Sequence, residues 1–536
     1  MRKIDFASRL RTFVAECNSE AIAVLLDEIS LFEKIPVRQF LRIHDALLFA
    51  MAYPPNAEIR RRCEDVLFAI LNNKKQARKN LNDSGIFNST LVSSYSLELV
   101  TWLQKNYPDA IQFHSFGQDT MDWGESLQLL FPDAESEVLT SGWSKNKLFR
   151  FLCGRRITTE KLIRLFHSSS NPTLAGHLFA KAQVYVTLDF SKNLISRTQA
   201  RSISYPVFFH SSIVKKPDTQ QIIHSPLPKA VPIRENQKEF LVTNARMMLA
   251  SLGRETDPVT SCAVNETEFY YLDRGFAIAL FYLRPQNRLA FDAYVGYMMY
   301  KNGLPIAYGG AWIFLDKALL GINIFEVYRG GESAVLFAQL LRCYSKRFGI
   351  NVFTVEPYQY GKNNPEGIHS GAYWFYYRFG FRSDDAQLRI IAEEEHQKII
   401  KDKNYKTPTR ILKKFTQSTI SLELKPSAFL TTSELSTRIT RYITTHYLGN
   451  REKAILAGEK KLRKYFGKIN MGKSAEFKKV WQNWCLIFMV VDAGRFPNSK
   501  EKATFQKMII EKSEKSESNY LIELNKLKYF FKVNSN

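Results

Sequence analysis

The stretch that decides the fold is Asn323-Ile324-Phe325-Glu326-Val327-Tyr328-Arg329-Gly330-Gly331-Glu332-Ser333-Ala334. An apolar, strand-like run ends in a glycine pair and passes directly into residues 335–342, whose apolar side chains recur at helical spacing. The pattern predicts a strand, a tight loop and a helix. Such a junction leaves backbone N–H groups at the helix start without intrahelical partners, and glycines let a ligand approach them closely. We therefore expect an anion, most often a phosphate, to bind there.

Strand-like segments surround this junction on both sides. Two runs, 292–300 and 306–315, flank Asn302-Gly303, which is the strongest short hairpin signal. Residues 319–327 continue as another strand, 351–357 read as a further one, and 371–378 form a short aromatic helix. The predicted order is an antiparallel meander, loop, helix, strand and helix. This order predicts an α+β domain with a mixed sheet.

The order of elements resembles the GNAT superfamily of N-acetyltransferases. In that family a strand ends in [Arg/Gln]-x-x-Gly-x-[Gly/Ala], whose amides and following helix bind the pyrophosphate of coenzyme A. Arg329 matches the first position and Ala334 the last, whereas Glu332 stands where the middle glycine is expected. The resemblance implies that acetyl-coenzyme A or another acyl-coenzyme A is the co-substrate. It places the cofactor-binding site at Arg329, Gly330, Gly331, Ser333 and Ala334.

A second motif of the family lies near the end of the same region. The pattern Ala-x-x-[aliphatic/aromatic]-Tyr-x-x-x-Gly-Phe is matched by Ala372, Phe375, Tyr376, Gly380 and Phe381. In many members the tyrosine lies near the leaving thiolate and acts as general acid, so the resemblance assigns that role to Tyr376. The resemblance covers residues 236–391.

Acyl transfer to an amine also needs a base that takes a proton. Glu326 at the end of one predicted strand, Glu356 at the end of the next, and the loop residue His369 are the candidates. Each has a plainer interpretation: a carboxylate paired with arginine, a surface carboxylate and a solvated histidine. Tyr376 could likewise be a packed core residue, and Gly330-Gly331 an ordinary turn.

The leading hypothesis is transfer of an acyl group from acyl-coenzyme A to an amine acceptor by direct attack. A carboxylate beside a diphosphate repels it by about 1 kcal/mol at roughly 4 Å in water. Either the Glu332 side chain points away, or the donor is not ordinary coenzyme A. One alternative is therefore an aminoacyl-tRNA-dependent peptidyltransferase-like enzyme, and another is a non-catalytic GNAT-like protein that binds nucleic acid or a protein partner.

Four regions are expected along the chain. They are an irregular α-helical domain over 1–203, with Asn56 as a helix N-cap; a Pro-rich linker over 204–235; a GNAT-like domain over 236–400; and a basic α-helical domain over 401–536. The last region holds 28 Lys and Arg against 12 Asp and Glu, or +16 of the chain's +23 net charge. Such a surface attracts nucleic acid or another polyanion, unless it is simply a solvated lysine-rich face. Within it, Thr432-Ser433 predicts a helix N-cap, and 512–518 reads as a loose connector.

The cysteines, the histidines and the lengths of the apolar runs narrow the classes of protein to which the chain can belong. Six cysteines lie apart without CxxC spacing, and the nine histidines do not cluster with them, so we expect neither a metal site nor a disulfide framework. No apolar run approaches the roughly 20 residues that cross a bilayer. These observations lead us to expect a cytoplasmic protein without a membrane span.

Overall fold

The structure is a computed structural model that describes residues 5–32, 35–73, 81–118, 121–140, 142–169, 171–466, 472–491 and 499–532. The chain divides into two compact units, each built from separate stretches of sequence. The first unit comprises Met1–Ile213, Asn236–Ser261 and Tyr300–Ile306. The second comprises Val214–Glu235, Cys262–Met299 and Ala307–Asn536. The two units are described separately.

Helices at the start of the first unit follow the predicted pattern. They are α1 (Phe6–Ala15), α2 (Ser19–Ser30), α3 (Val37–Ala52) and α4 (Ala57–Asn72). The Asn56 side chain accepts a hydrogen bond from the Ile59 amide, which confirms it as the N-cap of α4. Ile59, Val66, Leu67 and Ile70 are buried on one face of that helix. Helical periodicity therefore predicted this part correctly.

The rest of the first unit contains a sheet that the sequence analysis did not predict. Strands β1 (Thr90–Ser94), β2 (Ile111–Phe116) and β3 (Val184–Asp189) form an antiparallel sheet in the order β1-β3-β2. Val184, Val186 and Leu188 are buried at alternate positions of β3. The region 1–203, which was predicted as an irregular α-helical domain, therefore also contains a sheet. The helices of this part are α5 (Leu97–Asn106), α6 (Trp123–Gln128), α7 (Ser136–Leu139), α8 (Lys145–Cys153), α9 (Thr159–His167), α10 (Pro172–Lys181), α12 (Glu235–Ala250) and α13 (Asp257–Thr260).

The second unit is built on a mixed sheet of eight strands in the order β10-β11-β9-β8-β7-β6-β5-β4. This arrangement of helices and a mixed sheet confirms the α+β class. Asn302 and Gly303, with φ of 49° and 87°, form the predicted turn between β6 and β7. The strands are β4 (Glu268–Tyr271), β5 (Phe276–Phe281), β6 (Ala293–Lys301), β7 (Leu304–Phe314), β8 (Lys317–Ile324), β9 (Val352–Val355), β10 (Arg382–Ser383) and β11 (Ile420–Glu423).

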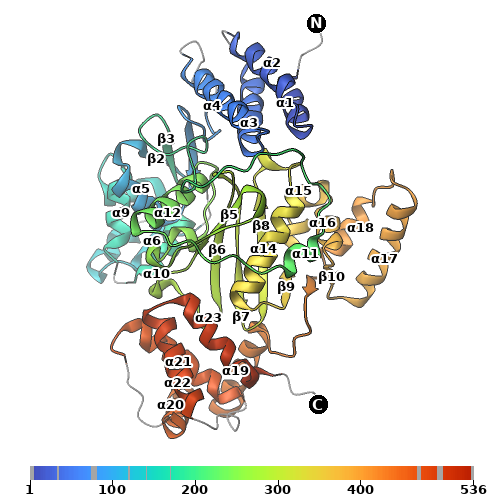
Figure 1. Cartoon of the computed structure of the whole chain (residues 1–536). Coiled ribbons are helices and arrows are strands. Elements are labelled where there is room, and N and C mark those ends of the chain that lie inside the picture. The colour runs from blue at the N-terminus through green and yellow to red at the C-terminus, as the bar shows by residue number, and fades with distance from the viewer. Residues whose placement is uncertain are drawn as a thin grey trace. The chain divides into compact units, whose positions relative to one another are not determined.

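Strands β8 and β9 are parallel, and helix α14 (Ser333–Phe348) connects them (Figure 1). Their pairing covers only Lys317↔Val352, Ala318↔Phe353 and Leu319↔Thr354. Beyond Leu319, β8 continues to Ile324 paired with β7 alone. The two strands therefore part at their carboxyl ends, next to the start of α14. Tyr344 fixes α14 on the sheet by donating a hydrogen bond to the Val295 carbonyl of β6.

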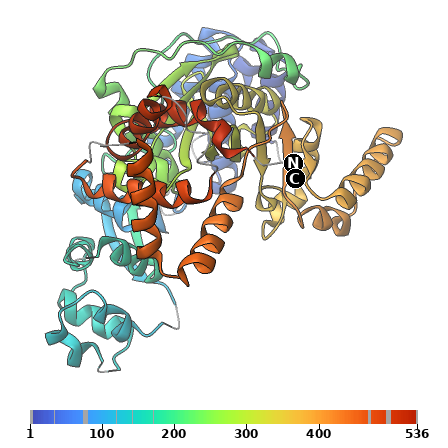
Figure 2. The ribbon, with the colours of Figure 1, turned by 90° about the horizontal axis from the view of Figure 1, so that it is seen from below.

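Short helices and the C-terminal helices complete the second unit. A projecting arm is made by α17 and α18, visible in orange in Figure 2. The helices are α11 (Thr219–His224), α15 (Pro365–His369), α16 (Ala372–Arg378), α17 (Ala386–Lys401), α18 (Thr409–Phe415), α19 (Thr432–Tyr447), α20 (Arg451–Phe466), α21 (Ala475–Val490), α22 (Ser499–Glu514) and α23 (Glu517–Lys526).

The region 401–536 differs from its prediction in three ways. It is not purely helical, because β11 pairs with β9 and lies inside the sheet. Thr431, not Thr432, caps α19, where it forms a capping box with Glu434. The predicted connector 512–518 is the junction of α22 and α23, where Lys512, Ser513, Glu517 and Ser518 are buried. This region also belongs to the same compact unit as the sheet, whereas the prediction gave it a domain of its own.

Candidate functional site

A pocket of about 270 Å³ lies where β8 and β9 part. We call it the strand-end pocket. The Gln359 side chain accepts a hydrogen bond from the Ile322 amide at 3.3 Å, and so replaces the backbone partner that β9 no longer supplies. The pocket is lined by Ile322, Asn323, Ile324, Arg329, Ser333, Tyr358, Gln359, Asn364, Glu366, Gly367, Ser370, Ala372, Phe375 and Tyr376.

Helix α14 begins at this pocket with unused hydrogen-bond donors. Its first intrahelical bond runs from the Leu336 amide to the Glu332 carbonyl, and no side chain caps the helix. The amides of Ser333 and Ala334 have no acceptor among the described residues. Gly330 has φ of +87°, a conformation that favours glycine, and a Cβ there would meet open space. Free donors and the positive end of the helix dipole together attract an anion.

Glu332, the residue that departs from the family motif, is turned into the protein interior. Its side chain is buried and accepts hydrogen bonds from Arg274 Nε at 2.9 Å and from the Val214 amide at 3.1 Å. Arg274 is placed for this contact by a left-handed backbone conformation, with φ of 60°. The carboxylate is absent from the lining of the strand-end pocket. Of the two alternatives for Glu332, the structure therefore fits the one in which the side chain points away.

Arg329, the expected pyrophosphate ligand, lines the pocket but is already paired. Its guanidinium forms an ion pair with Glu366 of α15 and donates from Nε to the Ile324 carbonyl at 3.3 Å. Both side chains are about half exposed or more, so the pair is open to solvent. An exposed pair of this kind contributes roughly 0 to 1 kcal/mol, so a bound anion can compete with Glu366 for the arginine. Sequence reasoning missed Glu366, although Asn364-Pro365-Glu366 has the pattern of a helix start.

Tyr376 lies in the pocket lining on α16, where it is buried. Phe337 and Phe381 hold its ring in edge-on contacts, each with centroids 5.6 Å apart. Burial raises the pKa of the Tyr376 hydroxyl well above its usual value, so the group stays protonated at neutral pH. That hydroxyl makes no hydrogen bond with the residues that the structure describes. A protonated, unengaged hydroxyl at a pocket wall is able to act as a proton donor.

The structure does not bring the other predicted catalytic residues to this pocket. Glu326 is exposed in a 3-10 turn, Glu326–Tyr328, after β8 has ended. Glu356 follows β9 as expected, but it is exposed and precedes another 3-10 turn, Pro357–Tyr360. Neither carboxylate lines the pocket. His369 is exposed at the end of α15 and lines a different cavity.

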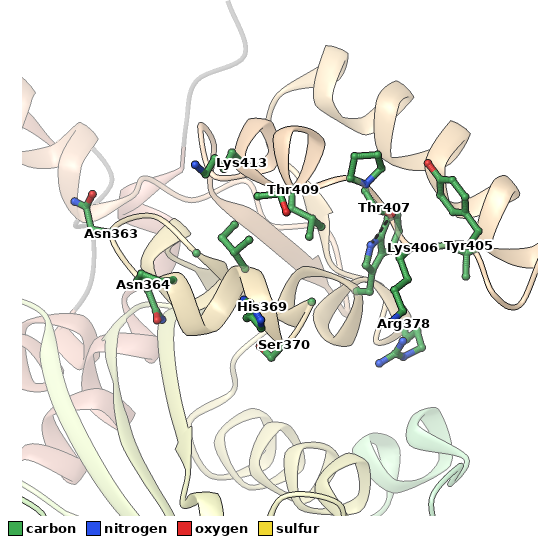
Figure 3. Close-up of a pocket in the computed structure, with 18 residues that line it drawn as sticks. Asn363, Asn364, His369, Ser370, Arg378, Tyr405, Lys406, Thr407, Thr409 and Lys413 are labelled. Atoms are coloured by element: carbon green, nitrogen blue, oxygen red, sulfur yellow. Dashed lines mark hydrogen bonds between the residues drawn. The ribbon is translucent and has the colours of Figure 1, made fainter.

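That second cavity is larger, about 1000 Å³, and we call it the basic pocket (Figure 3). It is formed by α15 and the loop before it, by α16, by the end of α17, by the loop between α17 and α18, and by α18 itself. Asn364 and Ser370 line both pockets, so the two cavities adjoin. Its lining is Gly361, Asn363, Asn364, Pro365, Ile368, His369, Ser370, Gly371, Trp374, Arg378, Ile399, Tyr405, Lys406, Thr407, Pro408, Thr409, Leu412 and Lys413.

Among the described residues, no group of three or more His, Cys, Asp or Glu side chains could hold a metal ion. In the same part of the chain, every helix is too short or too polar to cross a membrane. The six cysteines carry free thiols.

Comparison with protein-family models, with curated proteins and with solved structures gave no match.

Proposed function

We propose that the second unit has a GNAT-like fold and transfers an acyl group from acyl-coenzyme A to an amine. The antiparallel strands, the glycine loop, α14, the parallel strand β9 and the aromatic helix α16 follow one another in the order that the resemblance implies. The two motifs, which are far apart in sequence, both contribute side chains to the strand-end pocket: Arg329 and Ser333 from the first, Tyr376 from the second. This convergence supports a common site.

The observation that carries the proposal is the parting of β8 and β9 beside the free amides of α14. A diphosphate needs donors, and the amides of Ser333 and Ala334 supply them at a helix start. The amides and thioester of the acyl arm need polar partners in a narrow space. Beyond Leu319, β9 does not pair with β8, and side chains contact the β8 backbone instead: Gln359 at the Ile322 amide and Arg329 at the Ile324 carbonyl. The amide groups of a ligand can replace these side chains. The pocket thus suits a ligand that has an anionic end and an amide-containing arm.

The chemistry follows from the groups around the pocket. The amine nitrogen forms a bond to the thioester carbonyl carbon, and collapse of the tetrahedral intermediate breaks the carbon–sulfur bond. Tyr376 donates a proton to the departing sulfur. Glu366 is the carboxylate in the pocket lining, and it takes the amine proton directly or through water when an anion displaces it from Arg329. Because they lie outside this lining, Glu326 and Glu356 receive no role in the proposal.

Calorimetric titration of coenzyme A into protein freed of nucleic acid tests the proposal. We expect saturable 1:1 binding that falls by about ten-fold or more in Ser333→Glu, which places a carboxylate at the free amides. The matched control is Ser345→Glu, in the same helix and outside the pocket lining. Thermal unfolding of both variants checks that they are folded. Absence of coenzyme A binding to the unmodified protein, or equal losses in both variants, would refute the proposed donor site.

A further inference from the structure

The basic pocket has a charge composition unlike that of an ordinary protein surface. Its lining contains three permanent cations, Arg378, Lys406 and Lys413, and no Asp or Glu. Figure 3 shows Arg378 and Lys406 toward one end of the pocket and Lys413 toward the other. A pocket of about 1000 Å³ is at the upper end of the range for small-molecule sites. Its size and sign of charge together favour a small organic anion.

None of these three cations is neutralised by the protein. The side chains of Arg378, Lys406 and Lys413 form no ion pair or hydrogen bond with the residues that the structure describes. Two carboxylates of the neighbouring helix α17 contact other groups: Glu393 accepts from the Tyr377 hydroxyl, and Glu395 contacts Lys398 and the Tyr405 hydroxyl. Glu394 of α17 and Glu366 of α15 are exposed, and neither lines the basic pocket. A bound anion would therefore meet unshared positive charge.

The segment that carries Lys406 is held in place on both sides. The Tyr405 hydroxyl donates to Glu395 of α17 at 2.7 Å. The indole Nε1 of Trp374, on α16, donates to the Thr407 hydroxyl at 3.1 Å. These contacts fix the backbone around Lys406, so the pocket wall is formed before a ligand arrives. A preformed wall lowers the entropy that binding must overcome.

The position of the pocket connects it with the reaction site. Asn364 and Ser370 line both pockets, whereas Ser333 at the start of α14 lines only the strand-end pocket. A donor diphosphate at α14 therefore lies in the strand-end pocket. This leaves the basic pocket for the molecule that brings the amine. An acceptor that is itself a polycation would need carboxylates in the lining, which the basic pocket lacks.

We propose that the basic pocket binds the acceptor substrate, and that this acceptor is a small amine-bearing molecule with phosphate or an equivalent multiple negative charge. The assignment to the acceptor depends on the proposed acyl transfer. The anion site itself depends only on the charges of the pocket.

Calorimetric titration with inorganic tripolyphosphate tests the anion site. The pocket variant is Arg378→Gln/Lys406→Gln/Lys413→Gln. Its control is Lys401→Gln/Arg410→Gln/Lys414→Gln, which removes the same charge from exposed positions of α17 and α18 outside the lining. We expect saturable binding that weakens about ten-fold or more in the pocket variant and less than about two-fold in the control. Equal weakening in both variants, or no saturable binding by the unmodified protein, would overturn the proposal.

Titration of coenzyme A into the same variants separates the two proposals. Unchanged coenzyme A affinity in the pocket variant, with tripolyphosphate affinity lost, supports the assignment of the pocket to the acceptor. Loss of coenzyme A affinity in that variant would assign the pocket to the donor and overturn the acceptor assignment. If coenzyme A binds to no variant while tripolyphosphate behaves as expected, the acyl-transfer proposal fails and the anion site stands. Saturable binding of spermine to the basic pocket would contradict the anionic acceptor.

Discussion

Charged side chains are arranged in opposite ways at two places in the second unit. At the junction of α22 and α23, Lys512 and Glu517 are fully buried and pair at 2.7 Å. Arg288, also buried, pairs with Glu266 at 2.6 Å and donates to the carbonyls at the end of α22. In the basic pocket, by contrast, three cations face a cavity without any carboxylate in its lining.

The buried ion pairs at the α22–α23 junction serve the fold, whereas the cations of the basic pocket are available to a ligand. Burying an ion is costly unless a partner of opposite charge and hydrogen bonds compensate it, so the α22–α23 junction has to be matched internally. Exposed cations have no such requirement, because water solvates them until an anion arrives. The start of α14 combines both arrangements: the Glu332 carboxylate is paired with Arg274 in the interior, and the amides of Ser333 and Ala334 are left open.

The largest effect, on stability, is expected when one member of a buried ion pair is removed. Lys512→Met leaves Glu517 buried with much less compensation, so we predict a loss of about 3–5 kcal/mol in the free energy of unfolding. Denaturant titration measures it. Lys515→Met, at an exposed position three residues away, should change stability by less than about 0.5 kcal/mol. Similar losses in the two variants would show that the buried pair has no special structural role.

A substitution at Tyr376 tests the role of its hydroxyl, which makes no hydrogen bond with the described residues of the strand-end pocket. Tyr376→Phe removes the proton donor and keeps the ring contacts, so we predict that acetyl-coenzyme A cleavage slows by about a hundred-fold while coenzyme A affinity is unchanged. Free thiol release measures the rate. Glu326→Gln, at an exposed position outside the pocket, should retain the rate within about two-fold. A Tyr376→Phe protein as active as the unmodified one would exclude this hydroxyl as the acid.

Substitutions at Arg274 and Glu332 test how their ion pair affects anion binding at the start of α14. Arg274→Met leaves the Glu332 carboxylate without its cation near the start of α14, and we predict about five- to ten-fold weaker binding of coenzyme A. The double variant Arg274→Met/Glu332→Gln removes the carboxylate charge as well, so its affinity should return toward that of the unmodified protein. If the double variant binds as weakly as Arg274→Met, the effect would be structural rather than electrostatic.

The smallest expected effect is on the pH dependence of stability, to which the ion pair Glu268–Arg347 contributes. Burial alone would raise the pKa of Glu268, but the hydrogen bonds and charge of Arg347 outweigh it and lower the pKa below its usual value. The pair therefore contributes its full stability above the unfolded-state pKa of about 4.3, and loses it as pH falls through the lower folded-state pKa. Unfolding of Glu268→Gln between pH 5 and pH 3 should show a shallower loss of stability. Equal slopes would contradict this contribution.

The sequence predicted the elements whose patterns are local. The Asn302-Gly303 turn, the helix after Ser333 and the aromatic helix at 372–378 are each encoded within a few residues. The sheet of the first unit was missed because β1, β2 and β3 are short and lie far apart among helices. For the same reason β11, which is separated from β9 by 64 residues of chain between Val355 and Ile420, was read as part of a helical region.

For the candidate site, too, the sequence predicted the residues that belong to local motifs and missed those that only the fold brings together. Motifs located Arg329, Ser333 and Tyr376, and all three line the strand-end pocket. Glu332 could not be interpreted from sequence, because its partner Arg274 lies 58 positions earlier. The basic pocket has no local pattern, because Arg378, Lys406 and Lys413 come together only through the packing of α16, α18 and the loop between α17 and α18.

The most direct test of the account is a crystal structure of the protein with coenzyme A. We predict that the diphosphate accepts hydrogen bonds from the amides of Ser333 and Ala334, that the thiol lies beside the Tyr376 hydroxyl, and that the basic pocket holds none of the ligand. A diphosphate bound by Arg378 and Lys406, with the start of α14 left empty, would contradict the account.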